Sequence, residues 1–231
     1  MKLKKWIPWE GLKLLACATM LIDHIGAFLI PNMAFRAVGR LAFPIYCFLL
    51  VQGIRHTRDP WKYLLRMAIC AVASELPYDM LIAGGPSWAY QSVMVTLCLG
   101  LCMGISMEKM NKRPLKFLLV VPFVLLAELL NTDYGGYGIL MIALFLLVDT
   151  SFWGYVVLLG GMLLINWRMS SAMVSVLGIH IPIQILATGA LLPIAMYSGE
   201  QLTHSRTIKW AFFVFYPVHL LVLWLICCWL R

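Results

Sequence analysis

The chain has 231 residues, of which 62% are hydrophobic and 12% are charged, about half the charged share of an ordinary soluble domain. Its 18 Lys and Arg and 10 Asp and Glu cannot cover the surface of a soluble protein of 26.1 kDa, whereas lipid can cover an apolar exterior. The composition therefore excludes a soluble protein. It predicts an all-α fold, a polytopic integral membrane bundle of helices in contact with the lipid bilayer.

The net charge of +8 does not indicate that the protein binds nucleic acid. The basic residues are spread through a chain of mean hydropathy +0.88 and form no face that would hold a phosphate backbone. The seven cysteines lie in apolar runs without a CxxC pair or histidines at zinc-ligand spacing. We therefore expect packing cysteines and no metal site.

Apolar runs long enough to cross a bilayer, roughly 20 residues, recur along the whole chain. We expect about nine transmembrane helices in a single domain over 1–231, at 11–30, 35–54, 62–83, 88–107, 115–131, 135–149, 152–166, 172–196 and 208–230. The runs at 135–149 and 152–166 are short, so eight crossings are the alternative.

The basic residues predict the orientation, because Lys and Arg are retained on the cytoplasmic side during insertion. With a cytoplasmic N-terminus, twelve of them fall in cytoplasmic segments and four at the opposite side, including Arg168 and Arg231. Lys2 and Lys4 are among the twelve. The loops are too short to form a soluble unit, so any chemistry is expected within the bilayer or at its faces.

Ionisable side chains inside the expected helices are unusual, since each costs about 2.5–3.5 kcal/mol to insert. Most of them are expected in one leaflet, the outer one: Asp23, His24, Arg36, Arg40, Glu75, Asp79, Glu128, Asp133 and His180, with His219 at mid-depth of the last helix. An interhelical hydrogen bond explains His180 as well as a site does. The gathering of the others predicts a functional layer near the outer face.

Two pairs in this layer have helical spacing. Arg36 and Arg40 are four residues apart, as are Glu75 and Asp79, so each pair shares one helix face and the two pairs are complementary in charge. Ion pairs between the second and third helices would satisfy all four groups, either as part of a site or only as structural ties. Asp23 is expected to meet Arg36 or Arg40 rather than to orient its neighbour His24.

His24 ends a stripe that begins near the cytoplasmic face. Steps of four, three and four residues lead back from it to Met20, Cys17 and Lys13, about 16 Å along the helix. A buried histidine is commonly a packing residue. The charged groups at the same depth make His24 a candidate for chemistry instead.

Two loops could belong to a site. The turn NTDYGGYG at 131–138 places Tyr134 where it would line a site mouth or join an aromatic interfacial belt. On the cytoplasmic side, the segment 55–66 carries basic residues that would suit a nucleotide phosphate, although orientation signals alone produce the same pattern. These residues are Arg55, Arg58, Lys62 and Arg66.

Five blocks of the sequence resemble the TraX family, named for the conjugal transfer pilus acetylation protein. They are LKLLACATMLIDHIGAFL at 12–29, GRLAFPIYCFLLVQGIRHT at 39–57, KYLLRMAICAVASELPYDML at 62–81, DYGGYGIL at 133–140 and FYPVHLLVL at 215–223. The blocks cover about a third of the chain and occur in the family's order. His180 lies outside them.

The resemblance implies a transmembrane acyltransferase of the bacterial cytoplasmic membrane, which passes an acyl group from cytoplasmic acetyl-CoA to an amine or hydroxyl outside. Its acceptor would be a peptide or pilin N-terminus, a glycan or a lipid. Carried over by position, the family pattern marks Asp23, His24, Arg40, Arg66, Glu75, Asp79, Asp133, Tyr134 and His219. A transporter and a non-catalytic assembly partner remain alternative readings, although no inverted repeat supports the transporter.

The chemistry of acyl transfer suggests roles for these residues. A base must take the acceptor proton, and hydrogen-bond donors must hold the oxyanion. We expect His24 to be the base, Asp23 with Arg40 to fix its helix, and His219 or Tyr134 to contact the oxyanion or acceptor; an acyl-histidine intermediate is the alternative. The expected substrate-binding residues are Arg36, Glu75, Asp79, Asp133 and Tyr134.

Overall fold

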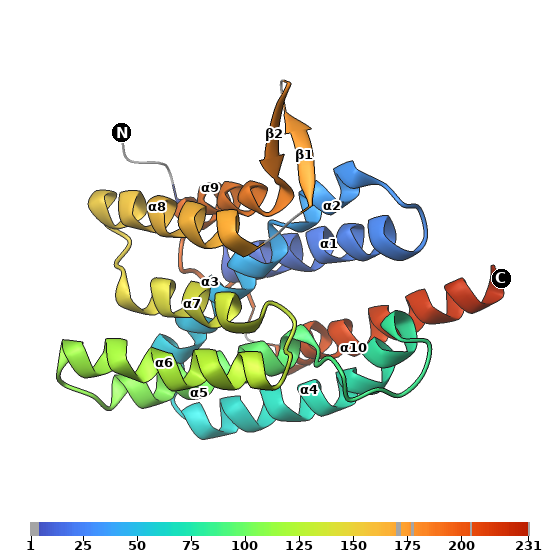
Figure 1. Ribbon diagram of the computed structural model, residues 1–231. Helices are drawn as coiled ribbons and strands as arrows, with labels where there is room; N and C mark the ends of the chain where they lie inside the picture. Colours follow the sequence, from blue (N-terminus) through green and yellow to red (C-terminus); the bar gives the residue numbers. More distant parts are fainter. Residues whose placement is uncertain (1–4, 170–171, 177, 204, 231) are drawn as a thin grey trace. The chain divides into compact units, whose positions relative to one another are not determined.

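The computed structural model describes residues 5–169, 172–176, 178–203 and 205–230. Lys2, Lys4 and Arg231, which entered the charge balance above, lie outside these residues. The described chain is mostly helical, with one short hairpin, which confirms the predicted all-α class (Figure 1). Its elements are α1 (Trp9–Phe28), α2 (Met33–Gly39), α3 (Ala42–His56), α4 (Pro60–Ile82), α5 (Val93–Glu108), α6 (Arg113–Leu129), α7 (Gly135–Leu147), α8 (Phe152–Met169), β1 (Met173–Val176), β2 (Ile179–Pro182), the 3₁₀ helix η1 (Ile183–Ala190), α9 (Leu191–Ala195) and α10 (Arg206–Trp229).

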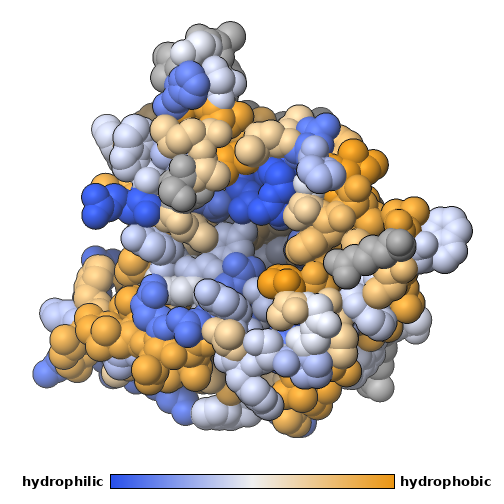
Figure 2. All heavy atoms as spheres, turned by 45° about the vertical axis from the view of Figure 1, so that its right-hand side comes forward, coloured by the Kyte–Doolittle hydropathy of each residue, from blue (hydrophilic) through white to orange (hydrophobic). Residues whose placement is uncertain are grey.

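Several helices have the dimensions of membrane spans. Within the described residues, four helical segments are long and apolar enough to cross a membrane, namely Trp9–Phe28, Met33–His56 (α2 and α3 taken together), Phe152–Met169 and Thr207–Trp229. Large hydrophobic side chains are exposed on many helices, and Figure 2 shows extensive hydrophobic areas on the face turned to the viewer. A soluble monomer rarely exposes so much apolar surface. The chain is a membrane protein.

The region 172–196 differs from the single helix predicted there. It forms the antiparallel hairpin β1–β2, followed by η1 and α9. Gly178 has a φ of 83° in the turn, a left-handed conformation that suits glycine and ends any helix. His180, expected inside a helix, is exposed on β2 and pairs with Ser175 in the strand register.

The second predicted helix is interrupted near its start. α2 ends at Gly39, and α3 begins at Ala42 after a two-residue turn. The amide of Arg40 donates to the carbonyls of Arg36 and Ala37, both at 3.3 Å, so the last turn of α2 tightens before the chain redirects. Arg36 and Arg40 therefore belong to a short separate helix and its C-cap.

The chain divides into two compact units. Unit 1 consists of Met1–Leu49 and Val148–Phe212, and unit 2 consists of Leu50–Leu147 and Phe213–Arg231. The boundaries fall within α3, within α10 and after α7. The single domain predicted over 1–231 stays a prediction.

In unit 1, α1 packs against α2, and α8 packs against η1. Close approach of α1 and α2 depends on two glycines. A Cβ on Gly26 would lie 2.5 Å from the Cβ of Phe35, and a Cβ on Gly39 would overlap the side chain of Asp23. The small residues thus allow the two helices to enclose the Asp23 carboxylate.

The N-terminal segment of unit 1 is fixed to the chain that follows α9. The amides of Trp6 and Ile7 donate to the carbonyl of Met196 at 2.9 and 3.0 Å. The Glu10 carboxylate accepts from the amides of Leu202 and Thr203, both at 3.0 Å. The start of α1 and the end of α9 consequently lie at the same end of unit 1.

In unit 2, α5 packs against α4, α6 and α7, and α6 packs against α7 (Figure 1). Leu101 and Met103 of α5, with Ile139 and Ile142 of α7, are fully buried. Asp59 caps α4 by accepting from the Lys62 amide at 3.0 Å, and this bond lowers the pKa of the Asp59 carboxyl. Unit 2 is therefore a helix bundle centred on α5.

Candidate functional site

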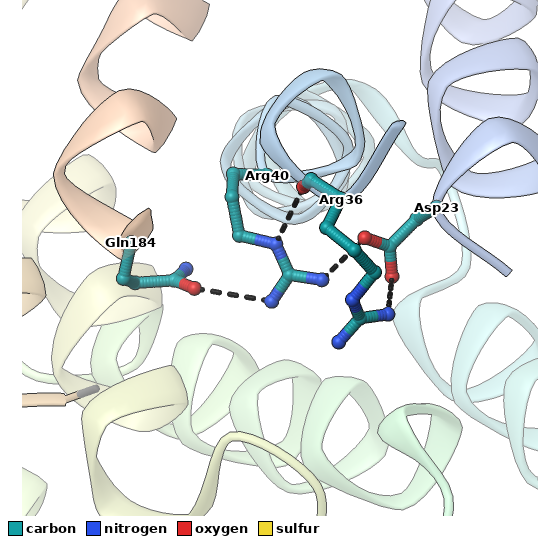
Figure 3. Close-up of polar contacts among 4 residues, drawn as sticks. All are labelled: Asp23, Arg36, Arg40 and Gln184. Atoms are coloured by element: carbon teal, nitrogen blue, oxygen red, sulfur yellow. Dashed lines mark hydrogen bonds and ion pairs between the residues drawn. The ribbon is translucent and has the colours of Figure 1, made fainter. Parts of the chain in front are cut away.

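Three charged side chains where α1 meets α2 form one cluster, the arginine clamp, made of Asp23, Arg36 and Arg40 (Figure 3). Nη1 of Arg36 donates to Oδ2 of Asp23 at 2.8 Å, and Nη2 of Arg40 donates to Oδ1. The Asp23 side chain is only 12% exposed, so it is desolvated between two guanidinium groups. The prediction that Asp23 meets Arg36 or Arg40 is confirmed, and it meets both.

Arg40 is held on three sides. Its Nε donates to the Arg36 carbonyl at 3.1 Å, and its Nη1 donates to Oε1 of Gln184 at 3.2 Å. Gln184 is 2% exposed and stands at the start of η1. The clamp therefore connects α1 and α2 with η1 inside unit 1, and Arg40 has a structural role there.

His24 follows the clamp aspartate directly. It is half-buried, and its ring centroid lies 6.1 Å from that of Phe28. Both Asp23 oxygens bond to arginine, which agrees with the expectation that Asp23 does not orient His24. Met20 and Cys17, the next residues of the predicted stripe, are buried, and Cys17 Sγ is 3.1 Å from the Tyr46 hydroxyl.

Glu75 and Asp79 have partners other than the predicted arginines. Glu75 accepts from the hydroxyl of Ser92 at 2.6 Å and from the Ser92 amide at 3.2 Å. Asp79 accepts from the Ser87 amide at 2.9 Å. Both carboxylates fix the segment between α4 and α5, because backbone amides that precede a helix need acceptors. The predicted pairing with Arg36 and Arg40, which belong to unit 1, stays a prediction.

Asp133 and Tyr134 lie in the turn before α7. The Asp133 carbonyl accepts from the Thr96 hydroxyl, and its amide donates to the Gln91 carbonyl at 2.8 Å. Tyr134 has a φ of 67°, which is uncommon for a residue with a side chain. The exposed Asp133 carboxylate interacts electrostatically with the buried hydroxyls of Tyr78 and Tyr216. Unit 2 thus brings Asp133 close to α10.

His219 is buried on α10, with 6% of its surface exposed. Its Nδ1 lies 2.9 Å from the Phe215 carbonyl, and its ring stacks on Phe215 with centroids 4.9 Å apart. A carbonyl oxygen can only accept, so Nδ1 carries the proton and the lone pair of the neutral imidazole is on Nε2. In the neutral form of His219, Nε2 is therefore the ring nitrogen that can accept a proton.

The basic residues expected to hold the acyl donor are spread along the α3–α4 connection. Nη2 of Arg55 donates to the last carbonyls of α7, at 3.3 Å for Phe145 and 3.2 Å for Leu146, and so caps that helix. Lys62 pairs with Asp59 at 3.1 Å on the surface. Arg58 is exposed, and Arg66 lies over the Tyr63 ring at 6.0 Å. Among the described residues, no group of His, Cys, Asp and Glu is arranged to hold a metal ion.

Two buried amides are functional candidates that the sequence analysis missed, because it considered ionisable groups only. Gln184 is one, through its bond to Arg40. The other is Asn166 of α8, which is fully buried, and its Oδ1 and Nδ2 have no hydrogen-bond partner in the described part of the chain. Such an amide carries a desolvation cost of about 1–3 kcal/mol.

Replacing Asn166 with Leu, which has a similar branched shape, is expected to raise the free energy of unfolding by about 1–3 kcal/mol because the unpartnered amide is removed. Thermal unfolding in detergent measures the change. Gln184→Leu is the contrasting variant and is expected to lower stability, since it takes an acceptor from Arg40. A loss of stability in Asn166→Leu would mean that the amide is satisfied in the folded protein.

Comparisons with known proteins show which family the chain resembles. The family model described as TraX protein matches residues 9–227. A protein of Dichelobacter nodosus, described as "Probable fimbrial assembly protein FimC, serogroup H1", is 28% identical over an alignment that covers 92% of this chain and 92% of that protein. No solved structure matches the chain. The match over nearly the whole chain confirms the resemblance drawn from the five blocks, and the chain belongs to the TraX protein family.

Proposed function

We propose that the protein is an integral membrane acyltransferase that moves an acetyl group from cytoplasmic acetyl-CoA to an amine or hydroxyl at the outer side of the bacterial cytoplasmic membrane. Membership of the TraX family supports this function, since the family is named for pilus acetylation. The name of the Dichelobacter relative supports a pilus or fimbrial setting for the acceptor. A peptide or pilin N-terminus, an envelope glycan and a lipid are the acceptor classes.

The observation that carries the proposal is the arginine clamp immediately before His24. Two arginines bind both oxygens of Asp23 and compensate the negative charge of its carboxylate. They also connect the outer part of α1 to α2. His24 is then presented from a fixed helix and is half-buried rather than enclosed. A positioned imidazole that a substrate can reach suits a general base, which takes the proton of the attacking amine or hydroxyl.

His219 and Tyr134 have complementary places in this scheme. His219, with its proton on Nδ1, offers Nε2 as a second proton acceptor. The role of oxyanion donor therefore falls to the Tyr134 hydroxyl or to backbone amides of its turn. Glu75, Asp79, Asp133 and Arg36 are the proposed acceptor contacts. An acyl-histidine intermediate on His24 remains the alternative chemistry.

The donor would bind at the other face of the membrane. Acetyl-CoA carries phosphates, and Arg55, Arg58, Lys62 and Arg66 supply positive charge along the α3–α4 connection. The described contacts leave Lys62 and Arg58 at the surface, where a phosphate can reach them. Arg55 is partly committed to the end of α7.

The proposed topology is multi-pass, with a cytoplasmic N-terminus. Contacts within unit 1 support a return crossing by η1 and α9, because η1 begins where α8 ends and α9 ends beside the start of α1. Eight residues of 3₁₀ helix and five of α-helix reach about 24 Å, which is close to the thickness of the hydrocarbon core. Nine crossings therefore remain the proposed number.

This topology predicts the accessibility of two introduced thiols. In a Cys228→Ser background, since Cys228 is an exposed native thiol, Ser175→Cys in β1 is expected to react with a membrane-impermeant maleimide on intact cells. Lys112→Cys, in the loop before α6, is expected to react only after permeabilisation. The reverse pattern, or equal labelling of both positions on intact cells, contradicts the proposed orientation.

The function itself is tested in cells. Intact-mass spectra of secreted peptides and of envelope glycans and lipids are compared between cells with and without the protein. We expect one species to lose the mass of a single acetyl group when the protein is absent. A transporter would instead change the distribution of a solute. An assembly partner would change the amount of surface structure without a mass difference. Either outcome contradicts the proposed enzymatic function.

A further inference from the structure

One end of unit 2 brings together the ends of several helices. A Cβ on Gly104 of α5 would lie 2.4 Å from Cδ1 of Ile54 in α3 and 3.4 Å from Cδ1 of Leu146 in α7. Lys109, the C-cap of α5, lies over the ring of Trp61 in the first turn of α4. The end of α3, the start of α4 and the ends of α5 and α7 therefore lie close together, and α6 begins shortly after Lys109.

Trp61 presents an indole ring at this end of unit 2. The residue is 60% exposed, although it belongs to the first turn of α4. Nζ of Lys109 lies 5.1 Å from the centroid of the ring, within the range of a cation–π interaction. Because the ring has a cation over one face and is largely exposed, its other face can stack on a second flat group.

Basic side chains flank the ring on the two connections that meet there. Lys112 and Arg113, at the start of α6, are exposed. The Lys62 side chain is 76% exposed, and its Nζ lies 3.1 Å from Oδ2 of Asp59. An ion pair this exposed adds little stability, so Lys62 can turn to another anion at small cost. These cations can therefore reach the phosphates of a ligand that lies on the ring.

The combination of a ring and cations selects one chemical class of ligand. Inorganic phosphate and the phosphate of a lipid headgroup would use the cations but have no flat group for Trp61. A purine nucleotide has both parts, since its base offers a π-face for stacking and its phosphates pair with Lys and Arg.

We propose that Trp61 stacks on the base of an adenine nucleotide, on the face of the indole opposite Lys109. Lys62, Lys112 and Arg113 then bind the phosphates. Under the proposed function, on which this proposal rests, the nucleotide is that of the acetyl-CoA donor. Trp61 and the start of α6 thus join the basic residues of the α3–α4 connection in a single donor site.

The test measures the dissociation constant of ADP for the full purified chain in detergent by isothermal titration calorimetry. ADP has the adenine ring and phosphates but no acyl group, so its binding requires no acyl transfer. Trp61→Leu, which removes the ring, is expected to raise the dissociation constant about tenfold through loss of stacking. Trp61→Phe, which keeps a smaller ring, should fall between the unaltered chain and Trp61→Leu.

Trp88→Leu is the matched control. Trp88 is 92% exposed and lies in the connection between the end of α4 and the start of α5, so it is far along both helices from Trp61 and Lys109. Its replacement is expected to leave the dissociation constant within about twofold of the unaltered chain. Lys112→Gln with Arg113→Gln should weaken ADP binding at low salt and make it less sensitive to added salt.

Three results would overturn the proposal. They are equal affinity of Trp61→Leu and the unaltered chain, an equal loss in Trp88→Leu, and binding of inorganic pyrophosphate as tightly as ADP. Loss of ADP binding when phosphatidylglycerol, but not phosphatidylcholine, is added to the micelles would assign the cations to a lipid headgroup and would also overturn it.

The outcomes for this site and for the proposed function can be told apart. ADP binding that depends on Trp61, together with no acetyl transfer, would support the nucleotide site and contradict the proposed function. Acetyl transfer, together with ADP binding that Trp61→Leu leaves unchanged, would support the proposed function and contradict the site.

Discussion

Replacing Asp23 with Asn is expected to lower the free energy of unfolding by about 3–5 kcal/mol, the usual cost of removing one partner from a buried ion pair. The reason lies in Arg40, whose side chain is 13% exposed and would lose the Asp23 carboxylate that accepts from its Nη2. The amide of Asn can accept one hydrogen bond but carries no charge to offset two guanidinium groups. Unfolding of the purified protein in mixed micelles measures the difference.

Asp149→Asn is the matched control. Asp149 is exposed before α8 and accepts from the Ser151 hydroxyl at 2.6 Å, a local bond that lowers the pKa of its carboxyl. No measurable change in unfolding is expected from its replacement. Removing the buried positive charge together with its partner, in Asp23→Asn with Arg40→Gln, should recover part of the stability lost in Asp23→Asn. Equal stability of the Asp23 and Asp149 variants would contradict the clamp.

His24→Ala is expected to lower the rate of acetyl transfer by about 10²–10⁴-fold, the usual contribution of a positioned general base. The fold should survive, since His24 is half-buried and the clamp does not include it. Transfer of labelled acetyl by the purified variant measures the rate. His180→Ala is the control, because His180 is exposed on β2 and is expected to leave the rate unchanged.

The comparison with His219→Ala separates the two histidines. If His24 is the base, His24→Ala should lower the rate of transfer by about 10²–10⁴-fold, while His219→Ala should lower it less. The opposite result, with the larger loss of rate in His219→Ala, would transfer the role of base to Nε2 of His219. Unchanged rates in both variants would remove histidine from the mechanism.

The sequence predicts the helical class and most helix positions because the composition and the length of each apolar run decide them. It fails at 172–196, where Val174, Ser175 and Val176 form a strand and Gly178 turns the chain back. An apolar run reads the same whether it continues as one helix or folds back as a hairpin. Strand propensity and the glycine are the signals that would have located the hairpin.

The sequence also predicts the contact of Asp23 with Arg36 or Arg40, but not that both arginines bind the same carboxylate. Helical spacing also makes Glu75 and Asp79 acceptable partners for Arg36 and Arg40, and this pairing between residues of units 1 and 2 stays a prediction. The binding of both arginines to Asp23 depends on the turn between α1 and α2 and on the space left by Gly26 and Gly39, which only the packed structure reveals. Asn166 and Gln184 were missed because burial makes them notable, whereas their residue type does not.

The most direct measurement of the proposed activity is acetyl transfer by the purified chain in liposomes. Labelled acetyl-CoA is supplied on the side of the α3–α4 connection, and an extract of envelope peptides, glycans and lipids is supplied on the other side as acceptor. The proposal predicts label in the acceptor or on the protein, abolished in His24→Ala and retained in His180→Ala. The proposal would be contradicted if the acetyl-CoA stayed intact and no label were transferred, while a thermal unfolding curve showed that the protein was folded.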